Sequence, residues 1–453
     1  MCRGRASTLH AVSSDWAGRK LHFVGIGGAG MSGLALVAHA LGAGVTGSDR
    51  AAGSPYAAQL RALGIEPAAG HAAANVPDGA ELVVSSAIPP ENPERVAARE
   101  RGLRELHRAE LLGELTRLRP TIAVTGTHGK TTTSSMLVHA LRGCAMDPAY
   151  LVGGAVRSTG SNAGWGGGEW LVVEADESDR SLLRLAPGIA VLTNAELDHH
   201  TTYSSQRDVD ETFRAFLALA DRAAVVWDRP GLLALAPAGI PVVPFDAEPE
   251  LTAGGSRFAL DAVRVELAVP GAHNARNAAA ALTAARLAGA PLAAAAAALR
   301  DFQGAGRRFE RLGTTPQGAA VVDDYAHHPT EVAATLEAAR TLAPRRLIAV
   351  FQPHLFSRTA RQAAEFGAAL AAADEVLVLD VYPARERADD FPGVSGLLVA
   401  RAAADAAAGR PVAWLPSFVQ AEQLLSQRLR EGDLVLTLGA GDVDALGRAL
   451  VAG

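Results

Sequence analysis

Short apolar runs separated by glycine turns and alanine-rich stretches form the main pattern of this chain. From Lys20 the text KLHFVGIGGAGMSGLALVAHALGAGVTGSD predicts a strand, a glycine turn, a helix and a second strand. AELVVSSAIPP predicts a further strand that two prolines close. Strands that alternate with helices predict a parallel sheet with helices on both faces. Residues 1–18 lack this pattern and are expected to form an untethered N-terminal extension.

The same alternation recurs twice further along the chain. TIAVTG, EWLVVEADESD, GIAVLTN and RAAVVWD are apolar runs that end in polar or acidic residues, as strands do at the carboxyl edge of a parallel sheet. RRLIAVFQPH, DEVLVLDVYP and DLVLTLGAGD predict three more buried strands between alanine-rich helices. Pro120 and the text RRFERLGTTPQG mark the boundaries. We therefore predict an α/β protein with domains at residues 19–118, 119–311 and 312–453.

The composition agrees with several packed cores and excludes some functions. Of 453 residues, 49% are hydrophobic and 20% charged, which is a globular balance. The net charge is -6, and the sequence has no cluster of basic residues of the kind that binds nucleic acid. No apolar stretch reaches the ~20 residues that cross a bilayer, and the first residues lack the apolar core of a signal peptide. A cytoplasmic protein is expected, with Cys2 and Cys144 as free thiols.

One glycine-rich stretch has the features of a phosphate-binding loop. Gly126-Thr-His-Gly-Lys-Thr-Thr132 follows a strand and precedes helical text, so its backbone N–H groups and the helix N-terminus would face an anion. Lys130 would bridge the β- and γ-phosphates of ATP, and the Thr131 hydroxyl would ligate magnesium. Lys20 and Lys130 are the only lysines among 42 basic residues, and a slender ammonium reaches between phosphates where a guanidinium does not. The motif is a shortened G-x-x-G-K-T rather than a strict Walker A, and a structural glycine turn is the alternative.

The other glycine signal does not name its ligand. Gly25-Ile-Gly-Gly-Ala-Gly30 is a G-x-G-x-x-G after a strand, and Asp49 follows at about the distance of the ribose-binding acid in NAD sites. Alone it predicts a nicotinamide-dependent oxidoreductase. The turn, however, requires only a pyrophosphate on a helix N-terminus, and a UDP-sugar offers one as readily as NAD does. A purely structural glycine turn also stays open.

Acidic residues follow two of the central strands. They stand in Glu174-Ala-Asp-Glu-Ser-Asp179 and in Thr193-Asn-Ala-Glu-Leu-Asp-His-His200. Hard oxygen ligands beside a phosphate loop suit magnesium. In isolation these segments would be solvated loops with surface histidines, but their coupling to a phosphate loop favours a metal site.

Eight motifs occur in order between Phe23 and Thr359: FVGIGGAGMSG, GTHGKTTT, EADESD, TNAELDH, GAHNARNAAAA, RRFE, VDDYAHHPTE and FQPHLFSRT. Together they resemble the UDP-N-acetylmuramate:L-alanine ligases of the Mur ligase family. The resemblance implies a UDP-binding Rossmann-like N-terminal domain, a central P-loop ATPase-type α/β domain and a Rossmann-like C-terminal domain that binds the amino acid. It implies ATP-dependent ligation of L-alanine to the lactyl carboxylate of UDP-N-acetylmuramate through an acyl phosphate, in peptidoglycan synthesis, with ATP and Mg²⁺. The first glycine loop would then serve UDP-N-acetylmuramate and not NAD.

The resemblance also implies roles for individual residues. Those implied for ATP are Gly126, Thr127, His128, Gly129, Lys130, Thr131, Thr132, His273, Asn274, Asn277, Arg308 and Asp324. Those implied for the UDP-sugar are Gly25, Gly27, Gly28, Ala29, Gly30, Met31, Ser32, Asp49, Ser85, Ser86, Glu177, Ser178 and Asp179. Those implied for L-alanine are Tyr325, His327, His354 and Arg358, the last for its carboxylate. Those implied for catalysis are Lys130, Glu174, His199, Arg308 and Asp324, with Thr131, Glu174 and His199 as metal ligands.

The chain departs from the family pattern at several positions. After His199 the family commonly has a methionine and an aspartate, but His200 and Thr201 stand here; a basic residue often follows the histidine of FQPH, but here it is Leu355. Related muramyl ligases bridge their metals with a carbamylated lysine, and no lysine follows Lys130, so another residue type must form the bridge.

Three alternatives stay open: a related ligase that adds glutamate or a peptide, a nicotinamide-dependent oxidoreductase, and a nucleotide-gated regulator without chemistry. The expected partners are UDP-N-acetylmuramate and L-alanine, with no nucleic acid and no membrane, in a monomer or a homodimer.

Overall fold

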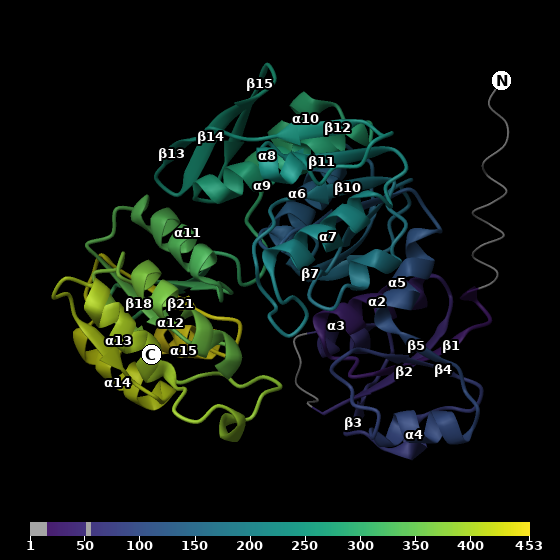
Figure 1. The fold of residues 1–453 in the computed structure, drawn as a ribbon, viewed down its shortest axis with the longest axis horizontal. Coiled ribbons are helices and arrows are strands. Elements are labelled where there is room, and N and C mark those ends of the chain that lie inside the picture. The colour runs from purple at the N-terminus through teal and green to yellow at the C-terminus, as the bar shows by residue number, and fades with distance from the viewer. Residues whose placement is uncertain (1–15, 51–55) are drawn as a thin grey trace. The chain divides into compact units, whose positions relative to one another are not determined.

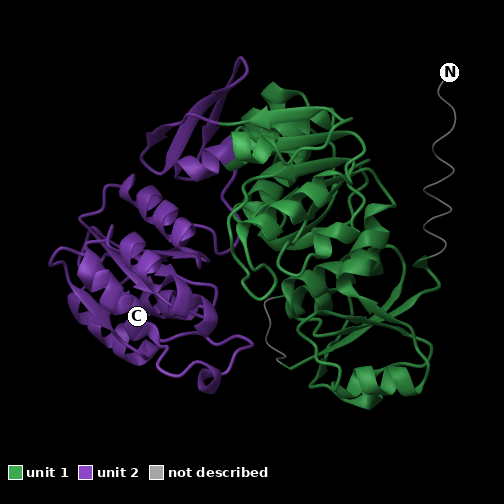
Figure 2. Ribbon diagram, viewed as in Figure 1, with its two compact units in different colours: residues 1–246, 277–298 green, residues 247–276, 299–453 purple. Residues whose placement is uncertain are grey.

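The computed structural model describes residues 16–50 and 56–453, which form two compact units (Figure 2). The first unit holds residues up to 246 together with 277–298, and the second holds 247–276 together with 299–453. Residues 1–15 of the expected extension, with Cys2, lie outside the described residues. Trp16 is 4% exposed and packs in the core of the first unit, so the expectation of an untethered extension up to residue 18 is wrong for its last residues.

The N-terminal sheet has the order β3-β2-β1-β4-β5, and its neighbouring strands pair in parallel (Figure 1). Its strands are β1 (Lys20–Val24), β2 (Gly44–Asp49), β3 (Ala68–Ala69), β4 (Glu81–Val84) and β5 (Glu105–His107). Its helices are α2 (Ala29–Ala40), α3 (Ala57–Ala62), α4 (Pro93–Glu100) and α5 (Arg108–Thr116). The predicted strand, glycine turn and helix are confirmed, with Gly25 at φ +78 directly after β1.

The central sheet has the order β12-β11-β10-β6-β9-β7-β8, parallel except for the antiparallel pair β7 and β8. Its strands are β6 (Thr121–Thr125), β7 (Ala149–Val156), β8 (Ser161–Gly164), β9 (Leu171–Glu174), β10 (Ile189–Leu192), β11 (Ala223–Trp227) and β12 (Val242–Phe245). Helices α6 (Lys130–Gly143), α7 (Gln206–Leu217) and α8 (Pro230–Leu233) follow strands of this sheet. β6 is buried along its whole length, between β10 and β9. The carboxyl ends of these three strands therefore bring the phosphate loop and both acidic segments to one edge.

The C-terminal sheet has the order β16-β17-β21-β18-β19-β20, parallel except for β16 against β17. Its strands are β16 (Glu310–Thr314), β17 (Ala320–Asp324), β18 (Arg346–Phe351), β19 (Glu375–Val378), β20 (Val412–Trp414) and β21 (Asp433–Leu438). Its helices are α11 (Pro329–Arg340), α12 (Phe356–Leu370), α13 (Gly396–Ala406), α14 (Phe418–Arg428) and α15 (Asp444–Ala452). The three buried strands expected here are β18, β19 and β21. The α/β fold class is confirmed.

A small antiparallel sheet was not predicted. It consists of β13 (Glu250–Thr252), β14 (Gly255–Leu260) and β15 (Val263–Leu267). These strands alternate polar and apolar residues, as in VRVEL, so they contain no continuous apolar run that would predict a buried strand. The alanine-rich α9 (Ala272–Leu287) and α10 (Leu292–Ala298) follow. Among the described residues, no helix is long and apolar enough to cross a membrane.

Candidate active site

The phosphate loop connects β6 to α6 through two glycines that no other residue can replace. Gly126 has φ +135, and a Cβ there would lie 2.1 Å from the Thr193 hydroxyl oxygen. Gly129 has φ +81, and a Cβ there would lie 2.5 Å from Asn277 Oδ1. Both the backbone conformation and the space therefore demand glycine. The alternative of an ordinary glycine turn does not explain why two neighbouring segments close in on the loop.

The segment after β10 holds this loop in shape. The Thr193 hydroxyl donates to His128 O at 2.6 Å, and the Asn194 amide both donates to His128 O and accepts from His128 N. The Thr127 hydroxyl donates to Glu196 O at 2.9 Å. The TNAE part of the second acidic motif therefore shapes the loop through hydrogen bonds and is not simply a solvated turn.

Lys130, the first residue of α6, points its ammonium into the loop. Nζ donates to Gly126 O at 2.8 Å and to Thr127 O at 3.1 Å, and it lies 2.8 Å from Glu177 Oε2. Burial opposes the charge, but the carboxylates of Glu177, Asp176 and Glu174 outweigh it, so the pKa of Lys130 is raised above its ordinary value. The side chain therefore stays a cation.

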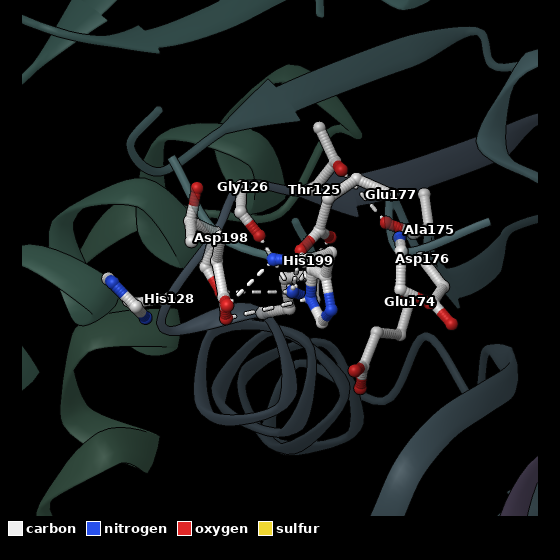
Figure 3. A network of polar contacts seen from close by, with 12 residues as sticks. Thr125, Gly126, His128, Glu174, Ala175, Asp176, Glu177, Asp198 and His199 are labelled. Carbon is white, nitrogen blue, oxygen red and sulfur yellow. Dashed lines mark hydrogen bonds and ion pairs between the residues drawn. The ribbon is translucent and has the colours of Figure 1, made fainter. Parts of the chain in front are cut away.

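Thr131 and Glu174 are hydrogen-bonded at the edge of the sheet, and Figure 3 shows Glu174 beside Asp176. The Thr131 hydroxyl donates to Glu174 Oε1 at 3.1 Å, and Gly153 N donates to Glu174 Oε2 at 2.7 Å. A hydroxyl oxygen next to a carboxylate oxygen is a pair of ligand atoms that suits a hard divalent cation. These are two of the three metal ligands that the resemblance implies.

His199, the third implied metal ligand, contacts Glu177. Its Nε2 lies 3.3 Å from Glu177 Oε1 and 3.8 Å from Asp198 Oδ2, and its backbone has φ +51. Figure 3 shows Glu177 and His199 close together beside Gly126. The resemblance placed Glu177 at the UDP-sugar, whereas its carboxylate contacts Lys130 and His199. A non-glycine residue with positive φ is uncommon, and strained backbone of this kind clusters at active sites.

Arg108 was not predicted as a site residue. His107 accepts from Ala109 N, and Glu110 accepts from His107 N, so a capping box fixes the start of α5 and with it Arg108. Arg108 Nη2 lies 3.0 Å from Asp176 Oδ2 and 2.9 Å from Asp179 Oδ2.

The guanidinium of Arg108 changes the electrostatics of the acidic segment. Burial would raise the pKa of Asp176, but Arg108 and Lys130 outweigh it and hold that pKa at about 2. A Cβ on Gly30 would lie 3.7 Å from Arg108 Nη1, and the Ser86 hydroxyl donates to Asp179 Oδ2 at 3.4 Å. Arg108 thus lies between the first glycine loop and the acidic segment.

The first glycine loop is closed by its own chain. Gly27 N donates to Asp49 Oδ2 at 2.8 Å, and Gly25 N donates to Ser48 O at 2.8 Å. Asn162, another residue that the sequence did not single out, donates from Nδ2 to Ala29 O at 2.6 Å. Gly28 and Gly30 are exposed at the start of α2. The loop therefore presents backbone at a helix N-terminus, as an anion site requires.

The HNARN motif opens α9. Asn277 is 8% exposed and lies against Gly129, which places it at the phosphate loop. Asn274 is 6% exposed, and its Nδ2 donates to Pro270 O at 2.7 Å. Burial, with the Arg276 guanidinium as a second cause, lowers the pKa of His273 to about 4, so that imidazole is neutral at pH 7.

Asp324 and Arg308 lie close together in the C-terminal unit. Asp324 ends β17 and accepts from Phe309 N at 2.7 Å and from Ala326 N at 2.8 Å. Burial raises the pKa of Asp324 to about 6, although Arg308 opposes that shift. The Arg308 guanidinium lies 5.1 Å from the centre of the Tyr325 ring.

The residues expected to hold the amino acid gather in the same unit. The Tyr325 and His327 rings meet edge to face at 5.4 Å, and the His327 and His354 rings at 6.0 Å. Arg358 Nη1 lies 3.3 Å from His354 Nδ1. Tyr382, which the sequence did not indicate, stacks on His354 at 5.9 Å.

Comparisons with known proteins decide the family. The model of the Mur ligase family catalytic domain matches residues 20–119, the Mur ligase middle domain matches 124–285, and the Mur ligase glutamate ligase domain matches 307–441. A UDP-N-acetylmuramate–L-alanine ligase of Renibacterium salmoninarum is 46% identical over 452 residues and covers 95% of both chains. The ligase of the same name from Acidithiobacillus ferrooxidans is 44% identical over 458 residues, 95% of this chain and 97% of the other. The chain belongs to the Mur ligase family.

A solved structure agrees with this assignment over nearly the whole Mur ligase chain. The crystal structure of a UDP-N-acetylmuramate-alanine ligase from Thermotoga maritima has a TM-score of 0.81 and 29% sequence identity, and covers 96% of this chain and 98% of that one. Mur ligases are ATP-dependent.

The phosphate loop of this Mur ligase fits a triphosphate with a divalent cation. The glycines leave the loop without side chains at Gly126 and Gly129, and Lys130 supplies a fixed cation at the start of α6. Thr131 and Glu174 offer oxygen ligands 3.1 Å apart. The donor set therefore matches hard-cation chemistry and not that of a soft metal.

Proposed function

We propose that the chain is an ATP-dependent ligase that joins L-alanine to the lactyl carboxylate of UDP-N-acetylmuramate in peptidoglycan synthesis. One observation carries the proposal: a relative named for this pair of substrates is 46% identical over 95% of both chains. The phosphate loop at Gly126–Lys130 supports the ATP requirement, which a nicotinamide-dependent oxidoreductase would leave unexplained. The boundaries between the three functional domains, after residues 118 and 311, belong to the same proposal.

ATP binds at the phosphate loop, where Lys130 faces its terminal phosphates and Asn277 borders the loop. Thr131 and Glu174 would hold a first Mg²⁺, and His199 would hold a second. When bound, Mg²⁺ supplies positive charge that offsets charge on the phosphate oxygens. Glu177, between Lys130 and His199, is the carboxylate positioned to take the part that a carbamylated lysine has in related ligases.

The first glycine loop binds the pyrophosphate of UDP-N-acetylmuramate. The exposed backbone at Gly28 and Gly30 stands at the N-terminus of α2, where the helix dipole favours an anion. Asp49 keeps the loop in shape by accepting from Gly27 N. Arg108 adds a cation between this loop and the acidic segment.

The reaction begins with activation of a carboxylate. A carboxylate is a poor acyl donor because its leaving group would be oxide, so its oxygen first attacks the γ-phosphorus of ATP and ADP leaves. Lys130 stabilises the charge that spreads over the transferring phosphoryl oxygens. The amine of L-alanine then attacks the acyl phosphate, inorganic phosphate leaves, and the amine loses a proton. Arg358 is the cation assigned to the carboxylate of L-alanine, with Tyr325, His327 and His354 around it.

Phosphate release tests the proposal directly. The purified chain with ATP, Mg²⁺ and UDP-N-acetylmuramate should release phosphate when L-alanine is added, and should not do so with D-glutamate or a tripeptide. Oxygen-18 in the lactyl carboxylate should appear in the released phosphate, because that oxygen is transferred with it. Phosphate release with D-glutamate or a tripeptide would identify a related ligase. If no acceptor led to phosphate release, the remaining alternative would be a nucleotide-gated regulator without chemistry.

A further inference from the structure

The first turn of α12 is held in an unusual way. Its N-cap residue, Leu355, has φ +70 and ψ 132 and supplies no side-chain cap. Leu355 is 8% exposed, and its N–H donates to Tyr382 O at 3.0 Å. A leucine rarely adopts positive φ, so the surrounding contacts must fix this conformation. Leu355 is also the residue that follows FQPH, where the family often has a basic residue.

Glu386 supplies the cap that Leu355 lacks. Its carboxylate accepts from Ser357 N at 2.9 Å and from the Ser357 hydroxyl at 2.5 Å. A carboxylate at a helix N-terminus satisfies amide groups that have no partner within the helix and interacts favourably with the helix dipole. Glu386 is half-buried and comes from the segment after β19, 29 residues along the chain.

This contact lies beside the residues assigned to the amino acid. Ser357 precedes Arg358, which is 4% exposed and whose Nη1 lies 3.3 Å from His354 Nδ1. On the other side of the turn, Tyr382 stacks on His354 with an angle of 12° between the rings, and Tyr382 N donates to Pro353 O at 2.8 Å. The segment that carries Tyr382 and Glu386 thus holds both His354 and the helix turn that bears Arg358.

We propose that Glu386 is a positioning residue of the amino-acid site: by capping α12 it sets the direction in which Arg358 and His354 meet the incoming amino acid. The proposal rests on the proposed function, which assigns those two side chains to L-alanine. A guanidinium binds a carboxylate in a fixed fork geometry, so a small displacement of its helix weakens binding. Glu386 itself does not touch the substrate.

Glu386→Ala is the first test, measured as phosphate release by the full chain with ATP, Mg²⁺ and UDP-N-acetylmuramate while L-alanine is varied. The KM for L-alanine should rise about ten-fold, which matches the loss of a hydrogen bond to a charged group. The KM values for ATP and UDP-N-acetylmuramate should stay within about two-fold, because no residue of either site is displaced. A merely structural Glu386 would change all three KM values together or none of them.

Two further variants make the test independent of folding. Glu386→Gln keeps one acceptor oxygen for Ser357 N, so the KM for L-alanine should fall back towards that of the unmodified chain. Ser357→Ala removes the hydroxyl bond and keeps the amide bond, so it should raise the same KM by a smaller factor. If Glu386→Ala does not fold, Ser357→Ala still decides the matter: an unchanged KM for L-alanine in that variant would overturn the proposal.

A matched control lies on the helix that Glu386 caps. Glu365 is exposed on α12, away from its first turn, so Glu365→Ala removes one negative charge near the helix without touching its cap and should leave the KM for L-alanine unchanged. If the KM for L-alanine rose equally in Glu365→Ala, the effect would come from net charge, and the positioning role of Glu386 would be rejected. The two proposals fail differently: an unmodified chain without L-alanine-dependent phosphate release refutes the function, whereas an active chain with an unaltered Glu386→Ala refutes only the positioning role.

Discussion

The Lys130 ammonium lies 2.8 Å from Glu177 Oε2, and the Glu177 side chain is 3% exposed. Without Lys130 that carboxylate is buried with its main countercharge removed. Lys130→Ala should therefore lower the free energy of unfolding by about 3 kcal/mol at pH 7. It should also lower kcat at least about 100-fold, because the transferring phosphoryl group loses a fixed cation. Urea denaturation and phosphate release measure the two effects.

The double variant Lys130→Ala/Glu177→Gln separates the two roles of Lys130. Removing the stranded charge should restore most of the stability and none of the turnover. Recovered turnover in the double variant would remove Lys130 from catalysis. Stability that does not recover would show that Glu177 is not its energetic partner.

Asp324 gives the C-terminal unit a predictable pH dependence. Its pKa is raised to about 6 from an ordinary 3.8, so the native state binds a proton more tightly than the unfolded state. Above pH 6 the ionised carboxylate destabilises the fold by up to about 3 kcal/mol. That cost disappears as the pH falls from about 6 to 3.8.

Asp324→Asn should therefore remove this pH dependence. The free energy of unfolding of the variant relative to the unmodified chain should increase by about 2 kcal/mol between pH 4.5 and pH 7.5, whatever its value at the lower pH. Urea denaturation at a series of pH values measures it. A relative stability that does not change with pH would mean that the Asp324 pKa is not raised.

Arg108→Ala should weaken the nucleotide-sugar site more than the ATP site. It leaves Asp176 and Asp179 without their shared guanidinium and removes a cation beside Gly30. The dissociation constant for UDP-N-acetylmuramate should rise about ten-fold or more, measured by isothermal titration calorimetry. Arg61→Ala is the control, since Arg61 pairs with Glu66 at the exposed surface, where such pairs contribute little. Equal effects of both variants would contradict the assignment.

Gly129→Ala tests the close approach of α9 to the phosphate loop. The new Cβ would lie 2.5 Å from Asn277 Oδ1, in addition to the strain of φ +81. Gly64→Ala, with φ +77 and nothing within 4 Å, carries the strain alone. Gly64→Ala should cost about 1 kcal/mol of stability and leave ATP affinity unchanged. Gly129→Ala should cost more and abolish ATP binding in calorimetry; ATP affinity equal to that of Gly64→Ala would rule out the steric role.

The sequence predicted the parallel sheets because buried strands there are continuous apolar runs such as TIAVTG and RRLIAVF. It did not predict β13 to β15, because polar and apolar residues alternate along exposed antiparallel strands. In β15, for example, the charged residues Arg264 and Glu266 interrupt the apolar ones. The local motifs that make the phosphate loop were also predicted from the sequence, since glycine, lysine and threonine act there within seven consecutive residues.

The missed residues act through partners far along the chain. Arg108 and Asp176 are 68 residues apart, and Glu386 and Ser357 are 29 apart. In the sequence, Arg108 within HRAELL and Glu386 within PARERADD look like any of the many charged surface residues. Glu177 lies inside a recognised motif, yet its contacts with Lys130 and His199 depend on how β6, β9 and β10 are ordered in the sheet. Such pairings follow from the fold rather than from local sequence.

Asp49 closes the first glycine loop by accepting a hydrogen bond from Gly27 N, a contact made within the protein itself. The conformational entropy of that turn is thus lost when the protein folds and not again when a ligand associates. A rigid turn can admit a nucleotide quickly and release it without refolding. A dinucleotide-type fingerprint can therefore be complete without specifying its ligand, because the acid near its end hydrogen-bonds the turn itself.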